Sequence, residues 1–465
     1  MFDLSQIQDD IGQLARLKTY THLLVCFPLA EDKSKEEITT ALHAAGGKLA
    51  AAFPWLVAKV VHEGRKPGNS GSFRLAPCPE FQQASNNNGL VIVKDLSGTS
   101  IPPFAEIRQA RGPSYMLDGK LLGPVVAFPE SYQESDEDPA RVFVIQASFI
   151  RGGILLDAAA QHNFIDGGGL FQCMQLFAKA LRGETFSDVE VEQGNRDRRS
   201  LIPLLGPGEP MLDHSHLRCP PATAGPSSSS DSLPPRAPAA WHFFRVPALN
   251  VSKIKAQANS DLRADPNETT PFVSTNDALS AFLWKRLSAV RLARNNNPAE
   301  LTKFSRALDA RRAMGVPPEY MGQMGYNATT RVSFGELDAM SLGSAAALLR
   351  AEVQERNNAY SIRSWATFIA GTADKATIMF AGKFNPDTDI GVSSLAHVEL
   401  YTCGFGPLGK PELVRRPNFR PLEGCVYFWS RTAGGDIDVL ACLNEMDIKG
   451  LREDVEWKGN TEYIG

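Results

Sequence analysis

A histidine followed four residues later by an aspartate, and then by three glycines, is the part of this chain best suited to proton chemistry. The stretch reads Gln161-His162-Asn163-Phe164-Ile165-Asp166-Gly167-Gly168-Gly169. An imidazole titrates near neutral pH, so His162 is a candidate to take a proton from a hydroxyl group. The spacing alone is weak evidence, because a buried histidine with a satisfied hydrogen bond shows the same pattern. The neighbouring elements must decide between a structural and a catalytic histidine.

The segments on either side predict a buried hairpin that ends at His162 and a helix that begins after the glycines. Residues 142–150 and 154–160 are nearly all apolar or small, and Arg151-Gly152-Gly153 between them is typical of a turn. Apolar residues then recur at helical spacing from Leu170 to Leu181. A histidine between a strand end and a helix is well placed for proton transfer.

The bulk properties favour a two-domain globular protein. The chain has 465 residues, more than one hydrophobic core usually serves. Its net charge is -4 and it has no long basic run, which argues against nucleic acid and anionic membranes as partners. No apolar stretch is long enough to cross a bilayer, and the N-terminus lacks a secretory signal. The 7 cysteines are scattered without a C-x-x-C pair, so we expect a cytoplasmic protein with reduced thiols.

The chain divides into two α/β units at its clearest break in composition. Residues 1–215 form the first unit, 216–240 a Pro/Ser-rich crossover, and 241–465 the second unit. The first unit has strand signals at 20–27 and 91–93 and a helix opened by Ser34 and Glu37. The second has a strand at 241–246, a helix capped by Ser274 or Thr275, a helix at 345–356, and strands near Val392, Tyr427 and Val439.

The run Asp213-His214-Ser215-His216 offers three potential metal ligands close together. It lies just before the crossover, and the sequence contains no matching cluster of ligands elsewhere. We therefore expect a solvated loop there, and no metal site in the protein.

Four motifs occur in one order along the chain. They are His162-Asn163-Phe164-Ile165-Asp166-Gly167, the segment Ser274–Lys285, Leu308-Asp309-Ala310-Arg311, and Gly404-Phe405-Gly406 followed by Leu408–Glu412 and Val414–Pro417. Together they resemble the BAHD acyltransferases, most closely the fungal branch typified by trichothecene 3-O-acetyltransferase. The likeness extends from the first strand to the last few residues, which makes it far more specific than the histidine and aspartate alone.

The resemblance implies an α/β (α+β) fold of two chloramphenicol-acetyltransferase-like domains, each a mixed sheet with helices, with a channel between them. In the family, acyl-CoA enters this channel from one face and the acceptor alcohol from the other. His162 would lie in mid-channel, whereas Asp166 would point away from the substrate and pair with Arg311 to link the domains. The resemblance also implies a monomer that holds no permanent cofactor.

The implied reaction is an acyl-CoA-dependent O-acyl transfer, with acetyl-CoA and a small-molecule alcohol of fungal secondary metabolism as substrates. His162 acts as general base, and the alcohol attacks the thioester directly; the chain has no G-x-S-x-G elbow. Ser393 and Ser394 match family residues near the reaction centre and would stabilise the oxyanion. Ser274, Lys410, Arg415 and Arg416 are candidate CoA contacts, with a helix cap, surface charges and a structural arginine as the alternative interpretations.

Two positions depart from the family. The Asp-Phe-Gly motif reads Gly404-Phe405-Gly406 here, and the tryptophan after the two serines is Leu395. These departures keep open a CoA-independent proton-transfer enzyme, such as a double-bond isomerase, dehydratase or cyclase, that uses the same pocket. A ligand-binding protein without activity is a third hypothesis. A peptide-synthetase condensation domain is a fourth, although Gln161 stands where such domains have a second histidine.

Overall fold

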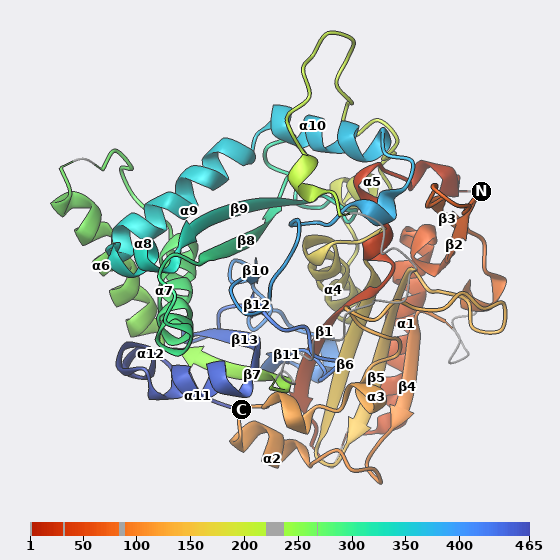
Figure 1. Cartoon of the computed structure of the whole chain (residues 1–465). Coiled ribbons are helices and arrows are strands. Elements are labelled where there is room, and N and C mark those ends of the chain that lie inside the picture. The colour runs from red at the N-terminus through yellow and green to blue at the C-terminus, as the bar shows by residue number, and fades with distance from the viewer. Residues whose placement is uncertain (1, 31–32, 83–88, 220–236, 267) are drawn as a thin grey trace, which may run out of the picture.

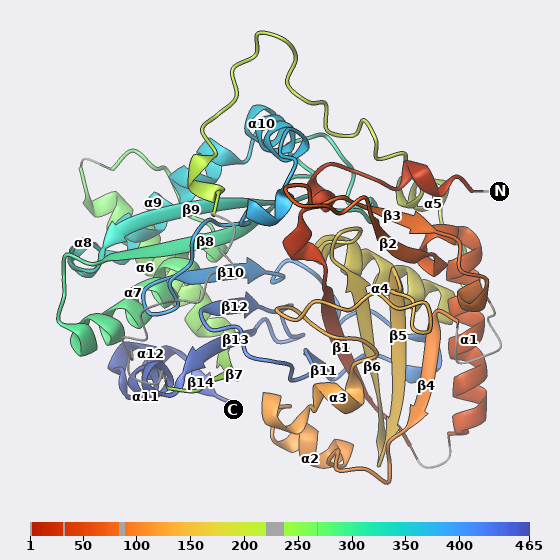
Figure 2. The same cartoon turned by 45° about the vertical axis from the view of Figure 1, so that its right-hand side comes forward.

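The computed structural model describes residues 2–30, 33–82, 89–219, 237–266 and 268–465. These residues form two large β-sheets, each with helices packed against it (Figure 1). In Figure 2 the strands of the two sheets run in clearly different directions. The predicted α/β fold with a mixed sheet in each half is confirmed. Most of the predicted crossover, residues 220–236, lies outside the described residues.

The first sheet carries the hairpin that ends at His162. Its strand order is β11-β1-β6-β5-β4, with β4 parallel to β5 and the other pairs antiparallel. Both strands of the hairpin are buried along their whole length, as their apolar sequences predict. The strands are β1 (Tyr20–Pro28), β4 (Val91–Asp95), β5 (Phe143–Ile150), β6 (Gly153–Gln161) and β11 (Leu413–Arg415), and a small separate sheet consists of β2 (Lys59–Glu63) and β3 (Ser72–Ala76).

Helices cover both faces of this sheet. On one face α1 (Lys35–Ala52) and α4 (Gly167–Leu181) contribute to the main apolar cluster, and α5 (Asp188–Gly194) follows α4. On the other face α2 (Phe104–Gln109) and α3 (Gly119–Leu122) join a smaller cluster. Ser34 caps α1 as predicted, since its hydroxyl accepts from the N–H of Glu37.

The second sheet has the strand order β14-β7-β13-β12-β10-β8-β9. Strand β10 runs parallel to both of its neighbours, and the other pairs are antiparallel. The strands are β7 (Ala239–Val246), β8 (Leu301–Asp309), β9 (Gly325–Ser333), β10 (Ile390–Ser394), β12 (Cys425–Phe428), β13 (Ile437–Asn444) and β14 (Glu462–Tyr463).

One face of the second sheet is apolar and packs against α6 (Ala248–Ala264), α7 (Thr275–Asn295) and α9 (Leu342–Arg356). None of the helices in the described ranges is long and apolar enough to cross a membrane. The remaining helices are α8 (Phe334–Ala339), α10 (Ala359–Ala370), α11 (Glu445–Glu453) and α12 (Val455–Asn460). Short 3-10 helices are η1 (Leu4–Gln6), η2 (Ile11–Gln13), η3 (Ala15–Leu17), η4 (Pro54–Val57), η5 (Pro79–Gln82), η6 (Ser114–Met116), η7 (Ser215–Leu217), η8 (Lys375–Thr377) and η9 (Gly406–Leu408).

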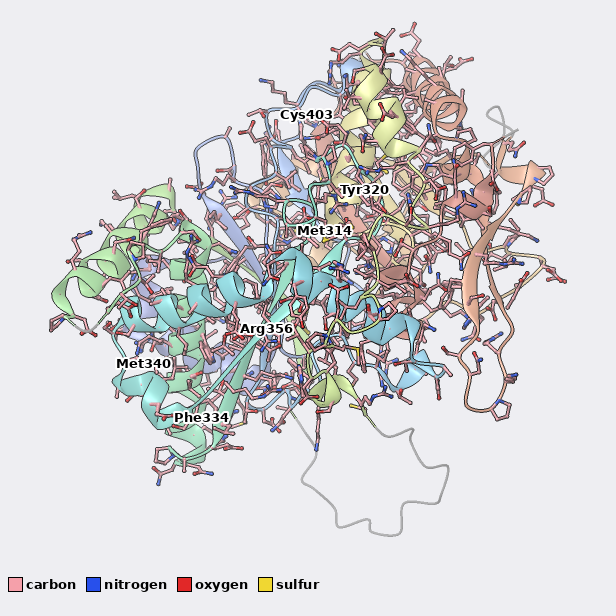
Figure 3. The ribbon with its side chains drawn as sticks, turned by 90° about the horizontal axis from the view of Figure 1, so that it is seen from above. Met314, Tyr320, Phe334, Met340, Arg356 and Cys403 are labelled. Carbon is pink, nitrogen blue, oxygen red and sulfur yellow. The ribbon has the colours of Figure 1, made fainter. Side chains whose placement is uncertain are left out.

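The two halves of the chain are joined by shared structure. A third apolar cluster combines residues near the N-terminus, such as Ile11, with residues of α10 and of β8 and β9. Strand β11 comes from the second half of the sequence but pairs with β1 in the first sheet. Figure 3 shows Met314 and Tyr320 near the middle of the molecule, where the ribbons of the two halves meet. Apart from β11, the strands of the first sheet come from residues 20–161 and those of the second sheet from residues 239–463. The predicted domain bounds stay a prediction.

Candidate active site

The β5–β6 hairpin delivers His162 to the end of β6, where the sequence predicts it. The main-chain N–H of His162 donates to the carbonyl oxygen of Thr19 at 2.9 Å. The adjacent Asn163 is buried, and its side-chain amide donates to the carbonyl oxygens of Gly12 and Leu14. The imidazole itself is only partly buried. Hydrogen bonds therefore hold the backbone at His162 in place, while its imidazole remains partly exposed to solvent.

Asp166 is buried and tied to the second half of the chain, as the resemblance implies. Its two carboxylate oxygens accept hydrogen bonds from the guanidinium of Arg311 at 2.8 and 2.9 Å. The same carboxylate caps α4 by accepting from the N–H of Gly169, and it accepts from the N–H of Met324 at 2.9 Å. Burial alone would raise the pKa of Asp166, but Arg311 and these N–H groups hold that pKa below its usual value.

The last of the three glycines is required by the close approach of another segment. A Cβ atom on Gly169 would lie 2.1 Å from the carbonyl oxygen of Met321. The segment 320–324, between β8 and β9, therefore runs directly against the start of α4. Arg311 holds this segment by donating to the carbonyl oxygens of Tyr320 and Gly322 at 3.1 and 2.8 Å.

The surroundings of His162 favour the neutral imidazole. Burial lowers the pKa of His162, and this effect outweighs a hydrogen bond to its own carbonyl oxygen and the charge of Asp166, which both raise it. Nδ1 is the ring nitrogen closer to the main chain, so a hydrogen bond from the ring to this carbonyl oxygen corresponds to the tautomer with its proton on Nδ1. The lone pair is then on Nε2, the nitrogen that points away from the backbone.

Gln323 contacts His162 and was not among the residues predicted from the sequence. It is 1% exposed, and its side-chain nitrogen donates to the His162 carbonyl oxygen at 3.2 Å and lies 3.5 Å from Nδ1. Its side-chain oxygen accepts from the N–H of Gly325 at 3.1 Å. The motif Leu308–Arg311 lies only twelve residues upstream of Gln323, but a lone glutamine in a loop gives no sequence signal.

The two predicted oxyanion residues lie on opposite faces of β10. Ser394 alternates with Val392, which packs against the helices of the second sheet, so Ser394 shares that face. Ser393 lies on the other face, together with Leu395. A Cβ on Gly167 would lie 3.5 Å from the side chain of Leu395, which places this face opposite the start of α4. Ser393 therefore shares the strand face of Leu395, and Ser394 lies on the opposite face.

Ser274 caps α7, so it has the helix-capping role that was the alternative to a CoA contact. Its hydroxyl accepts from the N–H of Asp277, and Asp277 accepts from the N–H of Ser274, so the two form a capping box. The carboxylate of Asp277 also pairs with Arg306 at 2.6 Å and with Arg350 at 3.4 Å. The N-terminus of α7 is thus partly buried, and the guanidinium groups of Arg306 and Arg350 lie beside it.

The three predicted CoA contacts on the last motif have different environments in the structure. Arg415 is completely buried, and it donates to Asp438 of β13 at 2.8 Å. This ion pair neutralises the guanidinium inside the protein and joins the two sheets, so Arg415 has the structural role that was the alternative to a phosphate contact. Arg416 is 5% exposed between the rings of Trp241 and Phe419, whereas Lys410 is exposed beyond the far end of α4.

The missing aspartate at Gly404 leaves no charge uncompensated. Arg182, at the end of α4, donates to the carbonyl oxygen of Gly404 and pairs with Glu184 at 2.6 Å. Phe405 keeps its packing, with its ring centre 5.1 Å from that of Phe27. Gly406 adopts φ +55°, and a Cβ there would lie 2.3 Å from the carbonyl oxygen of Leu181. Phe405 and Gly406 therefore have structural roles in this motif.

Restoring the aspartate at Gly404 is expected to have little effect. A Cβ at this position would meet Arg182 at an ordinary 3.7 Å, and Glu184 already pairs with that arginine. Gly404→Asp should change the free energy of unfolding by less than about 1 kcal/mol and leave kcat unchanged. Gly406→Asp is the matched control, and it should unfold far more readily because of the contact with Leu181. A large loss of kcat in Gly404→Asp would contradict this interpretation.

The histidines before the crossover do not form a metal centre within the described ranges, where no group of three or more His, Cys, Asp or Glu residues is arranged to hold an ion. His214 is buried, and its Nε2 shares a hydrogen bond with Ser364 at 2.9 Å. Burial lowers the pKa of His214 to about 4. This side chain packs against Trp365 and Phe368.

Comparisons with known proteins agree with this arrangement. Residues 19–181 match the model of the trichothecene 3-O-acetyltransferase-like N-terminal domain, and residues 125–458 match that of the Transferase family. The chain is 47% identical to the O-acyltransferase pigD of Monascus ruber, over 100% of both chains. It is 34% identical to trichothecene 3-O-acetyltransferase TRI101 of Fusarium sporotrichioides, over 98% of this chain and 96% of that protein.

A solved structure extends the likeness to three dimensions. The crystal structure of F. graminearum TRI101 complexed with coenzyme A and T-2 mycotoxin superimposes with a TM-score of 0.88 at 32% identity. The match covers 98% of this chain and 99% of that one. The fold of nearly the whole chain is therefore similar to that of a protein that was crystallised with coenzyme A. The chain belongs to the BAHD acyltransferase family.

Proposed function

We propose that this protein transfers an acetyl group from acetyl-CoA to a hydroxyl group of a fungal secondary metabolite, with His162 as the general base. The observation that carries the proposal is the partly exposed His162 imidazole at the end of β6, where burial lowers its pKa and favours the neutral form. Relatives that match nearly the whole chain are named O-acyltransferase and O-acetyltransferase, including epaC of Aspergillus niger at 44% identity. They support acyl transfer over the CoA-independent alternative.

The reaction follows from the chemistry of the groups present. Nε2 of His162 accepts the proton of the acceptor hydroxyl as its oxygen forms a bond to the thioester carbon. The carbonyl oxygen becomes negatively charged, and we expect the hydroxyl of Ser393 to donate to it. The carbon–sulfur bond then breaks, and the imidazolium returns its proton to the thiolate of CoA. No covalent acyl-enzyme is required, because the alcohol attacks directly.

The site would lie in a channel between the two sheets, with CoA approaching along the second half of the chain. Ser274 remains a proposed contact, supported by its place at the start of the 21-residue helix α7, where free N–H groups and the helix dipole favour anions. Arg416 is supported by a buried Nη1 atom without a hydrogen-bond partner in the described part of the chain. Lys410 is supported only by its exposure and its place in the motif.

Release of free CoA is the direct test. The purified protein should consume acetyl-CoA only when a suitable polyketide or terpenoid alcohol is present, and the product mass should rise by one acetyl group. A series of acyl-CoAs would establish the preferred chain length. Incubation of the same alcohols without CoA tests the isomerase, dehydratase and cyclase alternative. Failure with every acyl-CoA, together with no CoA binding by calorimetry, would contradict the proposal.

The pH dependence should report His162 as a base. Because burial lowers its pKa, kcat/KM should rise with pH and reach its plateau with a midpoint below about 6.5, the ordinary value for histidine. Activity is lost as pH falls through the lowered pKa, since the imidazolium cannot accept a proton. The profile should be measured from about pH 5 to 9 in buffers of constant ionic strength. A midpoint well above the ordinary histidine value would contradict this assignment.

We also propose that the protein acts as a monomer in the cytoplasm. All 7 cysteines are free thiols, and Cys26, Cys78, Cys173 and Cys442 are buried. Scattered, unpaired thiols suit a reducing compartment. Sedimentation of the purified protein and localisation of a fluorescent fusion would test the two statements separately.

A further inference from the structure

Gln323 is attached at both ends of its side-chain amide. The oxygen accepts from the N–H of Gly325, so the nitrogen must face the other way, toward His162. There it donates to the main-chain carbonyl oxygen of His162 at 3.2 Å and lies 3.5 Å from Nδ1. The His162 carbonyl also accepts from its own ring. One oxygen atom therefore receives both the imidazole N–H and the glutamine N–H.

The segment that carries Gln323 is held by the buried ion pair. Arg311 donates to the carbonyl oxygens of Tyr320 and Gly322, and the Asp166 carboxylate accepts from the N–H of Met324. These contacts lie on either side of Gln323 in sequence. The pair thus fixes the loop, and the loop carries Gln323, whose side chain contacts both the ring and the carbonyl oxygen of His162.

We infer that Gln323 is a positioning residue for His162, which keeps the imidazole in the rotamer and the Nδ1–H tautomer that leave Nε2 free to accept the substrate proton. This inference rests on the proposed function, because it assumes that His162 is the base. It also assigns a second effect to the Asp166–Arg311 pair. Besides joining the two halves, the pair aligns the base through the segment 320–324.

The alternative tautomer explains why such a residue matters. If the proton moves to Nε2, the neutral ring presents a donor to the acceptor hydroxyl and no longer removes its proton. The charge that acts on the ring is that of Asp166, which Arg311 neutralises, so electrostatics alone select the tautomer weakly. Fixing the carbonyl oxygen next to Nδ1 supplies the selection by hydrogen bonding instead.

The test compares Gln323→Leu and Gln323→Glu with the wild type. The leucine variant cannot hold the carbonyl, and kcat should fall by about 10- to 100-fold with KM for both substrates within about threefold, since alignment and not binding is lost. In the glutamate variant a carboxylate can accept from the imidazolium, so the acid limb of kcat/KM should move to higher pH. Nitrogen NMR of labelled histidine should show the Nδ1–H form in the wild type and a tautomer mixture in Gln323→Leu, with His162→Ala identifying the signal.

Gln146→Leu is the matched control. Gln146 is equally buried, and its amide donates to the carbonyl oxygens of Leu121 and Leu122 in α3, so its loss should lower stability without changing kcat or the His162 spectrum. A folded Gln323→Leu protein with wild-type kcat and the wild-type tautomer would overturn the inference, as would activity that falls only with the folded fraction. If the wild type transfers no acyl group, the proposed function fails, whereas the NMR comparison still decides whether Gln323 sets the tautomer.

Discussion

Replacing His162 by alanine lowers kcat for acetyl transfer by about 10²- to 10⁴-fold, the usual contribution of a general base. The hydroxyl group of the acceptor then has no neutral imidazole to remove its proton. Binding of acetyl-CoA should change little, because the ring is expected to contact the reacting atoms and not the nucleotide. Release of CoA under saturating substrates measures the first effect, and calorimetric titration with CoA measures the second.

His43→Ala provides the control for removing a histidine of similar environment. His43 is also partly buried, and its pKa is also lowered by burial, but it belongs to α1, which packs against α4 and the first sheet. This variant should retain wild-type kcat. A His162→Ala protein with wild-type kcat would remove the basis of the proposed mechanism, whatever the result for His43.

The second large effect concerns stability. Asp166→Asn should lower the free energy of unfolding by about 3–5 kcal/mol, because it leaves the guanidinium of Arg311 buried without its counter-charge. Asp309 contacts the same guanidinium at 3.0 Å but is about half exposed, so it compensates weakly. Asparagine is as good a helix cap as aspartate, so the substitution isolates the charge from the capping of α4. Chemical denaturation monitored by fluorescence gives the difference.

Asp95→Asn is the control, because the Lys35–Asp95 pair is 49% and 55% exposed and should contribute less than about 1 kcal/mol.

The stability that Asp166 contributes depends on pH, because its pKa differs between the folded and unfolded states. The folded pKa of Asp166 lies below its unfolded value, so the ion pair stabilises the protein above the unfolded pKa and loses its effect as pH falls through the folded one. The Asn variant should lack this acid-dependent loss. Equal stability of Asp166→Asn and the wild type at pH 7 would contradict the structural role.

Local patterns made part of this structure predictable. The β5–β6 hairpin and the helix after the glycines follow from unbroken apolar runs, a turn signal and helical periodicity, all of which act over a few residues. The cap at Ser34 is equally local. The pairing of Asp166 with Arg311 spans 145 positions, and it was predictable only through the resemblance to a family.

Features that depend on tertiary contacts were not predictable in the same way. Arg415 stands in a basic run that suggests phosphate binding, but its partner Asp438 comes from a strand of the other sheet. The contact of Gln323 with His162 depends on how the loop after β8 lies against α4. The choice between Ser393 and Ser394 requires the register of β10, which the sequence of two adjacent serines does not contain.

The place of β11 at the edge of the first sheet has a consequence for how the protein is made. Its three residues pair with Leu24, Val25 and Cys26 of β1, so the first sheet reaches its full width only when residue 415 is available. During synthesis the N-terminal half emerges first and exposes the free edge of β1 to solvent, a site at which nascent chains can associate. Folding of the two halves is therefore coupled by chain order, and a fragment that ends at the crossover would present this edge permanently.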